Sequence, residues 1–305
     1  MAEQKTKREK FSYSKLETYC TCAFKYYLKY VLKKSAFVEN ISTAFGKAIH
    51  ACEEDIANCL KEHRSINYNE LKGKLIYKLA EIEHKYPADY NSADKSGRTF
   101  REKAYKYLKE DIYRLENLIK ANPTYEIVGA EIPIKFEFDN EPFTGFIDRV
   151  IKDTTTGKYI IQDIKTWSVP KDEEDLKTPL QFVVYAMAII DAYGCTIDDI
   201  ECSYDLPICN IVQPAGTKGF YKRGLDKIKK LFTSIRAGEY KPTPNVLCYW
   251  CEYSITNPNA PKDLKMLCPY FCHKTPNDNN WEKENEWQGI EMHQQILEMY
   301  QKQYQ

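Results

Sequence analysis

The sequence predicts an α/β protein with a mixed central sheet flanked by helices, and three observations support this class. Apolar residues recur at helical spacing over residues 12–32 and over most of residues 43–122. From residue 126 the period changes to two, as in a strand. A strongly apolar helical run near residues 183–190 then lies between further strand-like segments. Helices and strands therefore alternate along one core.

The N-terminal half is predicted to be helical. We expect a first helix over residues 12–32 that breaks near Cys22, and a second helix from about residue 43 to residue 60. Residues 69–122 are predicted as mostly helix with a break over residues 86–97, where Pro, Asn, Ser and Gly cluster.

Three predicted strands follow at residues 126–138, 143–152 and 158–165, separated by the turns Asp139-Asn140 and 153–157. One helix is expected over residues 173–193, ended by Gly194. A further strand over residues 200–208, a basic amphipathic helix over residues 225–236 and a closing helix over residues 281–304 complete the elements. The expected domains are an N-terminal helical segment at 1–42, a core at 43–240 with a helical insertion at about 61–122, a cysteine-rich segment at 241–280, and a C-terminal helix at 281–305.

Composition limits the classes of function. The 305 residues include 44 basic and 44 acidic side chains, so the formal net charge is zero, which argues against histone-like coating of nucleic acid but not against a localised groove. No apolar run approaches the roughly 20 residues of a membrane-spanning helix, and the first ten residues lack an apolar signal-peptide core. We therefore expect no membrane partner and an intracellular location: cytoplasmic, or host cytoplasm if the protein is viral, and nucleoid-associated.

Two acids and a lysine lie on neighbouring predicted strands. Asp148 belongs to Gly-Phe-Ile-Asp-Arg-Val, and Asp163 and Lys165 belong to Gln-Asp-Ile-Lys-Thr. Residues i and i+2 of a strand face the same side, so Asp163 and Lys165 project together. Acids in apolar surroundings repel each other unless a cation lies between them, and such oxygen ligands favour Mg²⁺ or Mn²⁺. These parts suit phosphodiester hydrolysis, although an isolated D-x-K is more often a solvent-facing pair on an edge strand.

The order of these motifs resembles the PD-(D/E)xK nuclease superfamily, specifically its RecB-like branch. G-x-x-D-R and D-x-K-T are followed by Gln181 and Tyr185, which match the Q-x-x-x-Y motif of that branch. The family's nominal "PD" is reduced here to Ile147-Asp148. The resemblance implies a restriction-endonuclease-like core in which the catalytic residues are Asp148, Asp163, Lys165, Gln181 and Tyr185.

A further motif, Gly46 to His50, resembles the family's G-x-x-x-H on an N-terminal helix. Glu131, on the strand before the hairpin, resembles an acidic position of many relatives, although an ordinary exposed strand Glu explains it equally well. Glu53, one turn after His50, is either a partner that supports the metal ligands or a residue of the solvated face of the helix, and we expect the solvated face. The resemblance implies that the metal ligands are His50, Asp148, Asp163, the backbone carbonyl of Ile164, and Glu131.

Eleven cysteines are many for a reducing compartment, so some of them are expected to bind metal. Leu16, Tyr19 and Cys22 resemble the L-x-x-Y-x-x-C-P opening of AddB-type and CRISPR-associated iron–sulfur relatives, with Ala23 in place of the usual Pro. In those relatives one N-terminal cysteine joins three C-terminal ones around a 4Fe-4S cluster. The resemblance implies a cluster that joins the N- and C-terminal segments through Cys22, Cys248, Cys251 and Cys268.

The C-terminal spacing leaves two alternatives open. Sixteen residues separate Cys251 from Cys268, more than is usual in the family, so Cys272 competes with Cys268 as a cluster ligand. The same C-x-x-C and C-x-x-x-C pairs are close to the spacing of a Cys₄ zinc ribbon, which would bind Zn²⁺ without Cys22. The sequence around Cys22 favours the iron–sulfur cluster.

The resemblance implies a metal-dependent DNA exonuclease that acts in recombination, repair or phage replication on DNA that is single-stranded or has free ends. The alternatives are a catalytically silent DNA-binding or assembly subunit and a structure-specific endonuclease with a zinc ribbon. No Walker A sequence is present, so a helicase or recombination partner would be a separate chain. The candidate DNA-binding residues combine positive charge with aromatic rings: Lys25, Tyr26, Lys29, Lys229 and Lys230.

Overall fold

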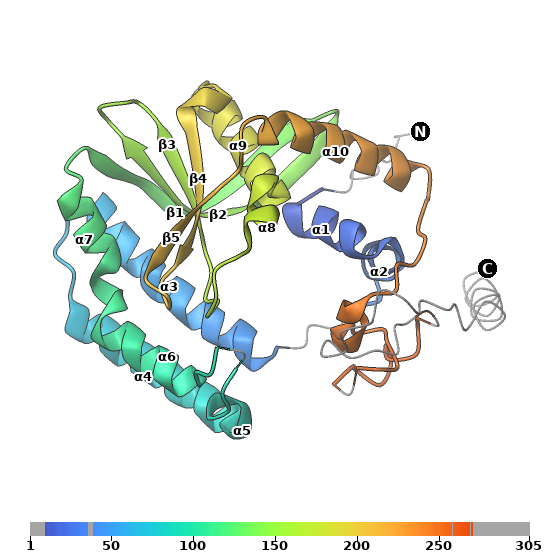
Figure 1. The fold of residues 1–305 in the computed structure, drawn as a ribbon, viewed down its shortest axis with the longest axis horizontal. Helices are drawn as coiled ribbons and strands as arrows, with labels where there is room; N and C mark the ends of the chain where they lie inside the picture. The colour runs from blue at the N-terminus through green and yellow to red at the C-terminus, as the bar shows by residue number, and fades with distance from the viewer. Residues whose placement is uncertain (1–9, 36–38, 95, 258, 269, 271–305) are drawn as a thin grey trace, which may run out of the picture. The chain divides into compact units, whose positions relative to one another are not determined.

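The structure is a computed structural model that describes residues 10–35, 39–94, 96–257, 259–268 and 270 (Figure 1). These residues form two compact units. The first, here called the sheet unit, contains residues 10–13 and 39–227, and the second, the cysteine unit, contains residues 14–35 and the described residues from 228 to 270. The helix predicted at 281–304 and Cys272 lie outside the described residues.

A five-stranded mixed sheet in the order β1-β2-β3-β4-β5 is the centre of the sheet unit. The long strands β1 (Tyr125–Phe138) and β2 (Glu141–Asp153) form an antiparallel hairpin, and β3 (Tyr159–Ile164) pairs antiparallel to β2. The strand β4 (Ile200–Leu206) is parallel to β3, and β5 (Ile211–Ala215) is antiparallel to β4. The α/β class with a mixed sheet is therefore confirmed, while β5, which contains Pro214 and lies at the sheet edge, was not predicted.

The turn between β1 and β2 follows from its two residues. Asp139 and Asn140 have φ values of 53° and 61°. Asn and Asp adopt this left-handed conformation more readily than other residues with a side chain, and two-residue hairpin loops of type I′ require it at both positions. The predicted end of the first strand is thus confirmed.

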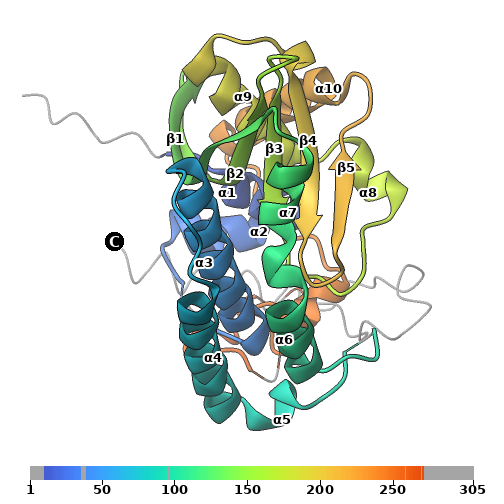
Figure 2. The same ribbon diagram turned by 90° about the vertical axis from the view of Figure 1, so that its left-hand side faces the viewer.

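Helices before the sheet pack beside it, with α3 and α4 side by side (Figure 2). The helix α3 (Ile41–Lys61) is capped by Asn40, whose side chain accepts a hydrogen bond from the backbone N–H of Thr43. The predicted break over residues 86–97 separates α4 (Tyr68–Lys85) from α6 (Phe100–Lys109), with the short α5 (Pro87–Tyr90) between them and α7 (Arg114–Ala121) following. The core includes fully buried side chains of α3, α4, α6 and the strands: Phe45, Ile49, Ile56, Leu75, Tyr107 and Ile151.

The single helix predicted over residues 173–193 is wrong, because the chain forms α8 (Glu173–Lys177) and α9 (Leu180–Tyr193). Pro179 separates them, since proline disfavours helical conformation in the residue before it and has no N–H to continue a helix. Gly194 ends α9 with φ at 65°, as predicted. The last helix, α10 (Phe220–Arg236), begins five residues earlier than predicted.

In the cysteine unit, α1 (Tyr13–Thr21) and α2 (Ala23–Tyr26) are separated at Cys22, whose backbone is extended. The predicted break is therefore confirmed. A π-helical turn (Tyr27–Val31) continues α2, and a 3₁₀ turn (Val246–Trp250) carries Cys248. A small apolar core holds this unit together: Phe24, Leu28, Tyr253, Leu264 and Tyr270. Among the helices of the described residues, none is long and apolar enough to cross a membrane.

A buried ion network fixes the helices before the sheet to its strands. Arg149 on β2 is only 1% exposed, and its Nη1 lies 3.1 Å from Oε2 of Glu53 on α3. Its Nη2 pairs with Asp205 on β4, and its Nε donates a hydrogen bond of 2.8 Å to Oε1 of Gln162 on β3. One guanidinium therefore connects α3, β2, β3 and β4.

Glu53 is 1% exposed, so the expectation that it lies on a solvated face is wrong. It pairs with Arg149 and also accepts a 2.8 Å hydrogen bond from the hydroxyl of Tyr107 on α6. Asp205 in turn pairs with Arg114 of α7. A carboxylate in this position is stable only because a cation and a hydroxyl group satisfy it.

We expect Arg149→Met to lower the free energy of unfolding by about 3–5 kcal/mol, because Glu53 and Asp205 would remain buried without their shared cation. Lys158→Met is the matched control, since Lys158 and Glu201 form an exposed pair at 2.7 Å, and it should leave stability nearly unchanged. Chemical denaturation of both variants measures the difference. Equal losses in the two variants would contradict the role of the network.

Gly224 permits the close packing of α10 on α9. A Cβ added at Gly224 would lie 2.2 Å from Cγ2 of Val183, a side chain that is fully buried. We expect Gly224→Ala to destabilise the protein by about 1–3 kcal/mol through overpacking. Gly73→Ala, in α4 with open space around it, should instead be neutral or stabilising by up to about 1 kcal/mol. Thermal unfolding of the two variants tests the opposite signs, and a stabilising Gly224→Ala would contradict this packing.

Candidate active site

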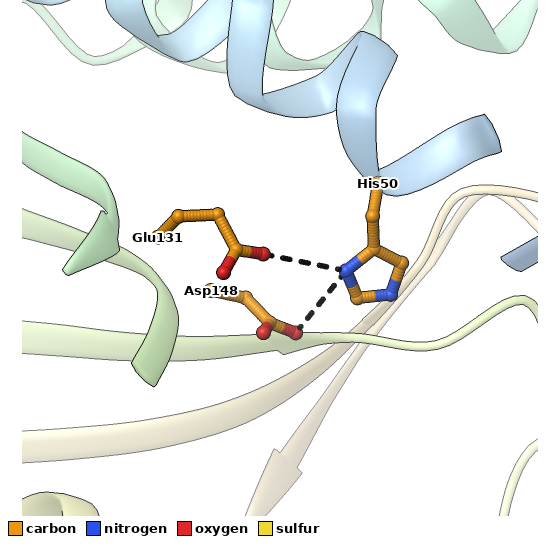
Figure 3. A group of neighbouring side chains, drawn as sticks. All are labelled: His50, Glu131 and Asp148. Atoms are coloured by element: carbon orange, nitrogen blue, oxygen red, sulfur yellow. Dashed lines mark ion pairs between the residues drawn. The ribbon is translucent and has the colours of Figure 1, made fainter. Parts of the chain in front are cut away.

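Three side chains from different elements meet beside the middle of the β1–β2 hairpin (Figure 3). His50 of α3 places its Nδ1 3.9 Å from Oε1 of Glu131 on β1 and 3.8 Å from Oδ2 of Asp148 on β2. One nitrogen and two carboxylate oxygens thus lie within 4.8 Å of one another. No other set of three His, Cys, Asp or Glu side chains is as close in the part of the chain that the structure describes.

Glu131 reaches this group through an unusual backbone conformation. Its φ is 45°, in the left-handed region, while Ala130 and Ile132 on either side keep their pairing with Arg149 and Ile147 on β2. A non-glycine residue held in this region costs free energy that the surrounding sheet must supply. The pairing on either side holds Glu131 in this conformation, with its carboxylate beside His50.

The other predicted residues form an adjoining group at the end of β3. Asp163 is 1% exposed, and its Oδ2 lies 2.6 Å from Nζ of Lys165. Its Oδ1 accepts a 2.5 Å hydrogen bond from Nε2 of Gln181 on α9, which also lies 2.9 Å from the hydroxyl of Tyr185. The two motifs D-x-K and Q-x-x-x-Y therefore meet on one carboxylate.

Ile164 links the two groups. Its backbone N–H donates a 2.7 Å hydrogen bond to Oδ2 of Asp148. Burial raises the pKa of Asp163 to about 7, the charge of Lys165 opposes this shift, and the negative charge of Asp148 adds to it. Burial acts against a charged His50, but the nearby carboxylates of Glu131 and Asp148 outweigh it and raise the pKa of His50. The site therefore gathers more negative charge than its own cations balance.

A divalent cation fits this set of donors. Carboxylate oxygens and one imidazole nitrogen are ligands that Mg²⁺ or Mn²⁺ accepts. The buried Oδ2 of Asp163 makes no hydrogen bond of good geometry despite its ion pair with Lys165, so it retains capacity for a cation. His50, Glu131, Asp148 and Asp163 are the side chains that would hold the ion.

Four cysteines of the cysteine unit line a second site. Cys22, Cys248, Cys251 and Cys268 border one cavity of about 350 Å³. The backbone N–H of Thr243 donates to Sγ of Cys22 at 3.4 Å. Cysteines more than 200 positions apart in the sequence thus meet at one cavity.

Burial favours the protonated form of two of the thiols in this cavity. Burial raises the pKa of Cys251 to about 11 and raises that of Cys268 well above its usual value. Sγ of Cys268 donates a hydrogen bond of 2.8 Å to the carbonyl of Tyr270. Metal binding here would release protons, because the ligand is the thiolate.

The predicted DNA-binding residues differ in exposure. Tyr26 is 1% exposed and packs against other aromatic rings, so the expectation that it stacks on a nucleobase is wrong. Lys25 forms a 2.8 Å ion pair with Glu252, which reduces its availability to phosphate. Lys29 lies beside the ring of Tyr30, with its Nζ 5.6 Å from the ring centroid. Lys229 and Lys230 are exposed on α10.

Sequence reasoning missed the residues that support the metal-binding group. Arg149 and Glu53 stand next to, or one turn from, predicted ligands. An arginine inside the apolar run Gly-Phe-Ile-Asp-Arg-Val was a usable signal, because a buried guanidinium requires acidic partners elsewhere. Nothing in the sequence marked Glu53 or Asp205 as those partners.

Comparisons with curated proteins and with solved structures carry no argument about the function of this chain. A search of curated proteins gave no significant match. Among solved structures the chain is similar to the crystal structure of SSO0001, with 15% sequence identity over 78% of this chain and 95% of that chain. The TM-score is 0.27, too low to bear on function.

A family model supplies the stronger result. The model of the PD-(D/E)XK nuclease superfamily matches residues 10–256. The match covers most of the chain, including the strands and helices that carry His50, Glu131, Asp148, Asp163 and Lys165. The protein therefore belongs to the PD-(D/E)XK nuclease superfamily.

Proposed function

We propose that this protein is a Mg²⁺- or Mn²⁺-dependent deoxyribonuclease of the RecB-like branch that acts as an exonuclease on DNA ends or single strands. One observation supports the proposal most directly: His50, Glu131 and Asp148 lie close together beside the Asp163–Lys165 pair. This group occurs in a chain that belongs to the nuclease superfamily. Recombination, repair or phage replication is the process that such an activity would serve, with any helicase on a separate chain.

Each side chain has a role that follows from its surroundings. A bound divalent ion supplies positive charge to the phosphoryl oxygens and lowers the pKa of a bound water. Lys165 lies 2.6 Å from Asp163 and can orient the attacking water or balance the charge that develops on the phosphate. Gln181 holds the Asp163 carboxylate in place, and the Tyr185 hydroxyl lies against the same Gln181 amide.

The buried acids favour an active enzyme over a silent DNA-binding subunit. Asp163 is 1% exposed, and burial raises the pKa of its carboxyl group. Keeping this carboxylate ionised at neutral pH lowers the stability of the folded protein unless a bound cation offsets the cost. The left-handed backbone of Glu131 likewise costs free energy of folding. A scaffold without catalytic activity would have no need for either feature.

We expect Asp163→Asn and Lys165→Met to lower cleavage of linear DNA at least about a hundredfold, because each removes a charge worth several kcal/mol to the transition state. Glu201→Gln, an exposed acid on β4, is the matched control and should keep full activity. Chelation should abolish wild-type activity, and added Mg²⁺ or Mn²⁺ should restore it. Wild-type rates in Asp163→Asn would overturn the assigned site.

We further propose that the cavity of the cysteine unit holds a 4Fe-4S cluster with Cys22, Cys248, Cys251 and Cys268 as ligands. Four thiolates are the ligand set of such clusters, and backbone amides directed at the sulfurs, as at Cys22, are typical second contacts. A cluster bound to residues 22 and 248 would close a very long loop and so stabilise the fold. Cys272 competes with Cys268 as the fourth ligand.

Cys22→Ser should reduce the iron content and the visible absorbance of anaerobically purified protein, which in the wild type should hold about four iron atoms per chain. Cys20→Ser, two residues away and exposed, is the matched control and should keep the full cluster. Metal analysis and the absorbance spectrum measure both variants. A content of one zinc per chain that Cys22→Ser does not change would contradict the cluster and support the zinc ribbon.

A further inference from the structure

The β1–β2 hairpin extends beyond the candidate metal ligands, and one of its faces continues away from them. Side chains alternate between the faces of a strand, so Asp148, Phe146 and Thr144 of β2 share a face. Cross-strand pairing places Pro133 opposite Phe146 and Lys135 opposite Thr144. We call these four residues the hairpin strip: Pro133, Lys135, Thr144 and Phe146.

Phe146 is unusually exposed for a large aromatic residue of a sheet strand. It is 58% exposed, whereas the adjacent Ile147, which points to the other face, is fully buried. The apolar core therefore lies on the opposite side of the hairpin, and Phe146 adds nothing to it. It lies two positions from Asp148, which corresponds to about 7 Å along a strand. The ring of Phe146 is thus exposed to solvent close to the acidic residues of the candidate site.

Lys135 adds a cation to the same face. It is exposed and has no ion-pair partner among the residues that the structure describes. The next residue of β1 on this face is Glu137, so positive charge does not continue along the hairpin. The strip therefore has the order acid cluster, aromatic ring, single cation.

This order matches the order of groups along a nucleic-acid strand. A divalent ion held by Asp148 and its neighbours would bind one phosphate, the ring of Phe146 can stack on the base that follows, and Lys135 can pair with the next phosphate. In a duplex both faces of an internal base are already covered by its neighbours. Only an unpaired or terminal base has a free face for Phe146.

We propose that the hairpin strip binds the unpaired nucleotide next to the scissile phosphate, and so directs the enzyme to single strands or frayed ends. The proposal rests on the proposed nuclease function of the adjoining site. A single nucleic-acid strand is the occupant that accounts for both the aromatic ring and the cation, and for their position beside the acids. A protein partner would account only for the exposed ring.

The test measures binding of labelled oligothymidylate and of a blunt DNA duplex in a Lys165→Met background, which keeps all the candidate metal ligands but slows cleavage. Adding Phe146→Ala should weaken binding of the single strand roughly fivefold to a hundredfold and leave duplex binding unchanged. Phe146→Trp should keep the affinity for the single strand. Tyr77→Ala, an exposed aromatic residue on α4, is the matched control and should have no effect. Adding Lys135→Gln should lower the salt dependence of binding by the equivalent of about one phosphate contact.

Two outcomes would overturn the proposal. In the first, Phe146→Ala binds the single strand as tightly as its parent. In the second, it weakens duplex and single strand equally, as a general surface or protein-docking role would allow. Cleavage assays on protein with native Lys165 distinguish a failure of the hairpin-strip proposal from a failure of the proposed nuclease function. Wild-type protein that cleaves no DNA refutes the nuclease, whereas an active wild type with unchanged Phe146→Ala affinity refutes the strip alone.

Discussion

The arrangement of the sheet unit depends on one buried ion network. In it the guanidinium of Arg149 lies between the carboxylates of Glu53 and Asp205, away from solvent. Arg149 directly follows Asp148 on β2, and Glu53 follows His50 by one turn of α3. The ion pair in the core therefore also sets how closely His50 approaches Asp148. A buried charge without its partner costs several kcal/mol, so the helix cannot slide along the strand without a large penalty.

The two units carry candidate sites of different ligand chemistry. The sheet unit gathers carboxylates and an imidazole, which suit hard divalent ions, and the cysteine unit gathers thiols, which suit iron or zinc. The first site holds three carboxylates, among them Asp163, whose pKa is raised chiefly by burial, and a Glu131 with a left-handed backbone. The folded chain compensates for both through its apolar core, and a bound cation would relieve the repulsion.

Much of the fold was predictable because its signals are local. The two-residue period of β1, the Asp139-Asn140 turn, the Gly194 helix end and the break at Cys22 each depend on a few consecutive residues. The division of α8 from α9 was equally local, since Pro179 marks it, but the apolar run that follows concealed it. The edge strand β5 carries no strong pattern, because both its faces are largely exposed.

The order of the motifs in the sequence predicted the family. Local periodicity predicted the α/β class and the candidate acids and lysine of the strands, because spacing within a strand or helix fixes which side chains share a face. Only the tertiary structure decided which distant groups meet. It buried Glu53 and Tyr26, joined Arg149 to Asp205, and brought Cys22 to the cavity of Cys248. Such contacts join residues far apart in the chain, and no local period records them. Burial of a polar side chain depends on partners that folding alone brings together.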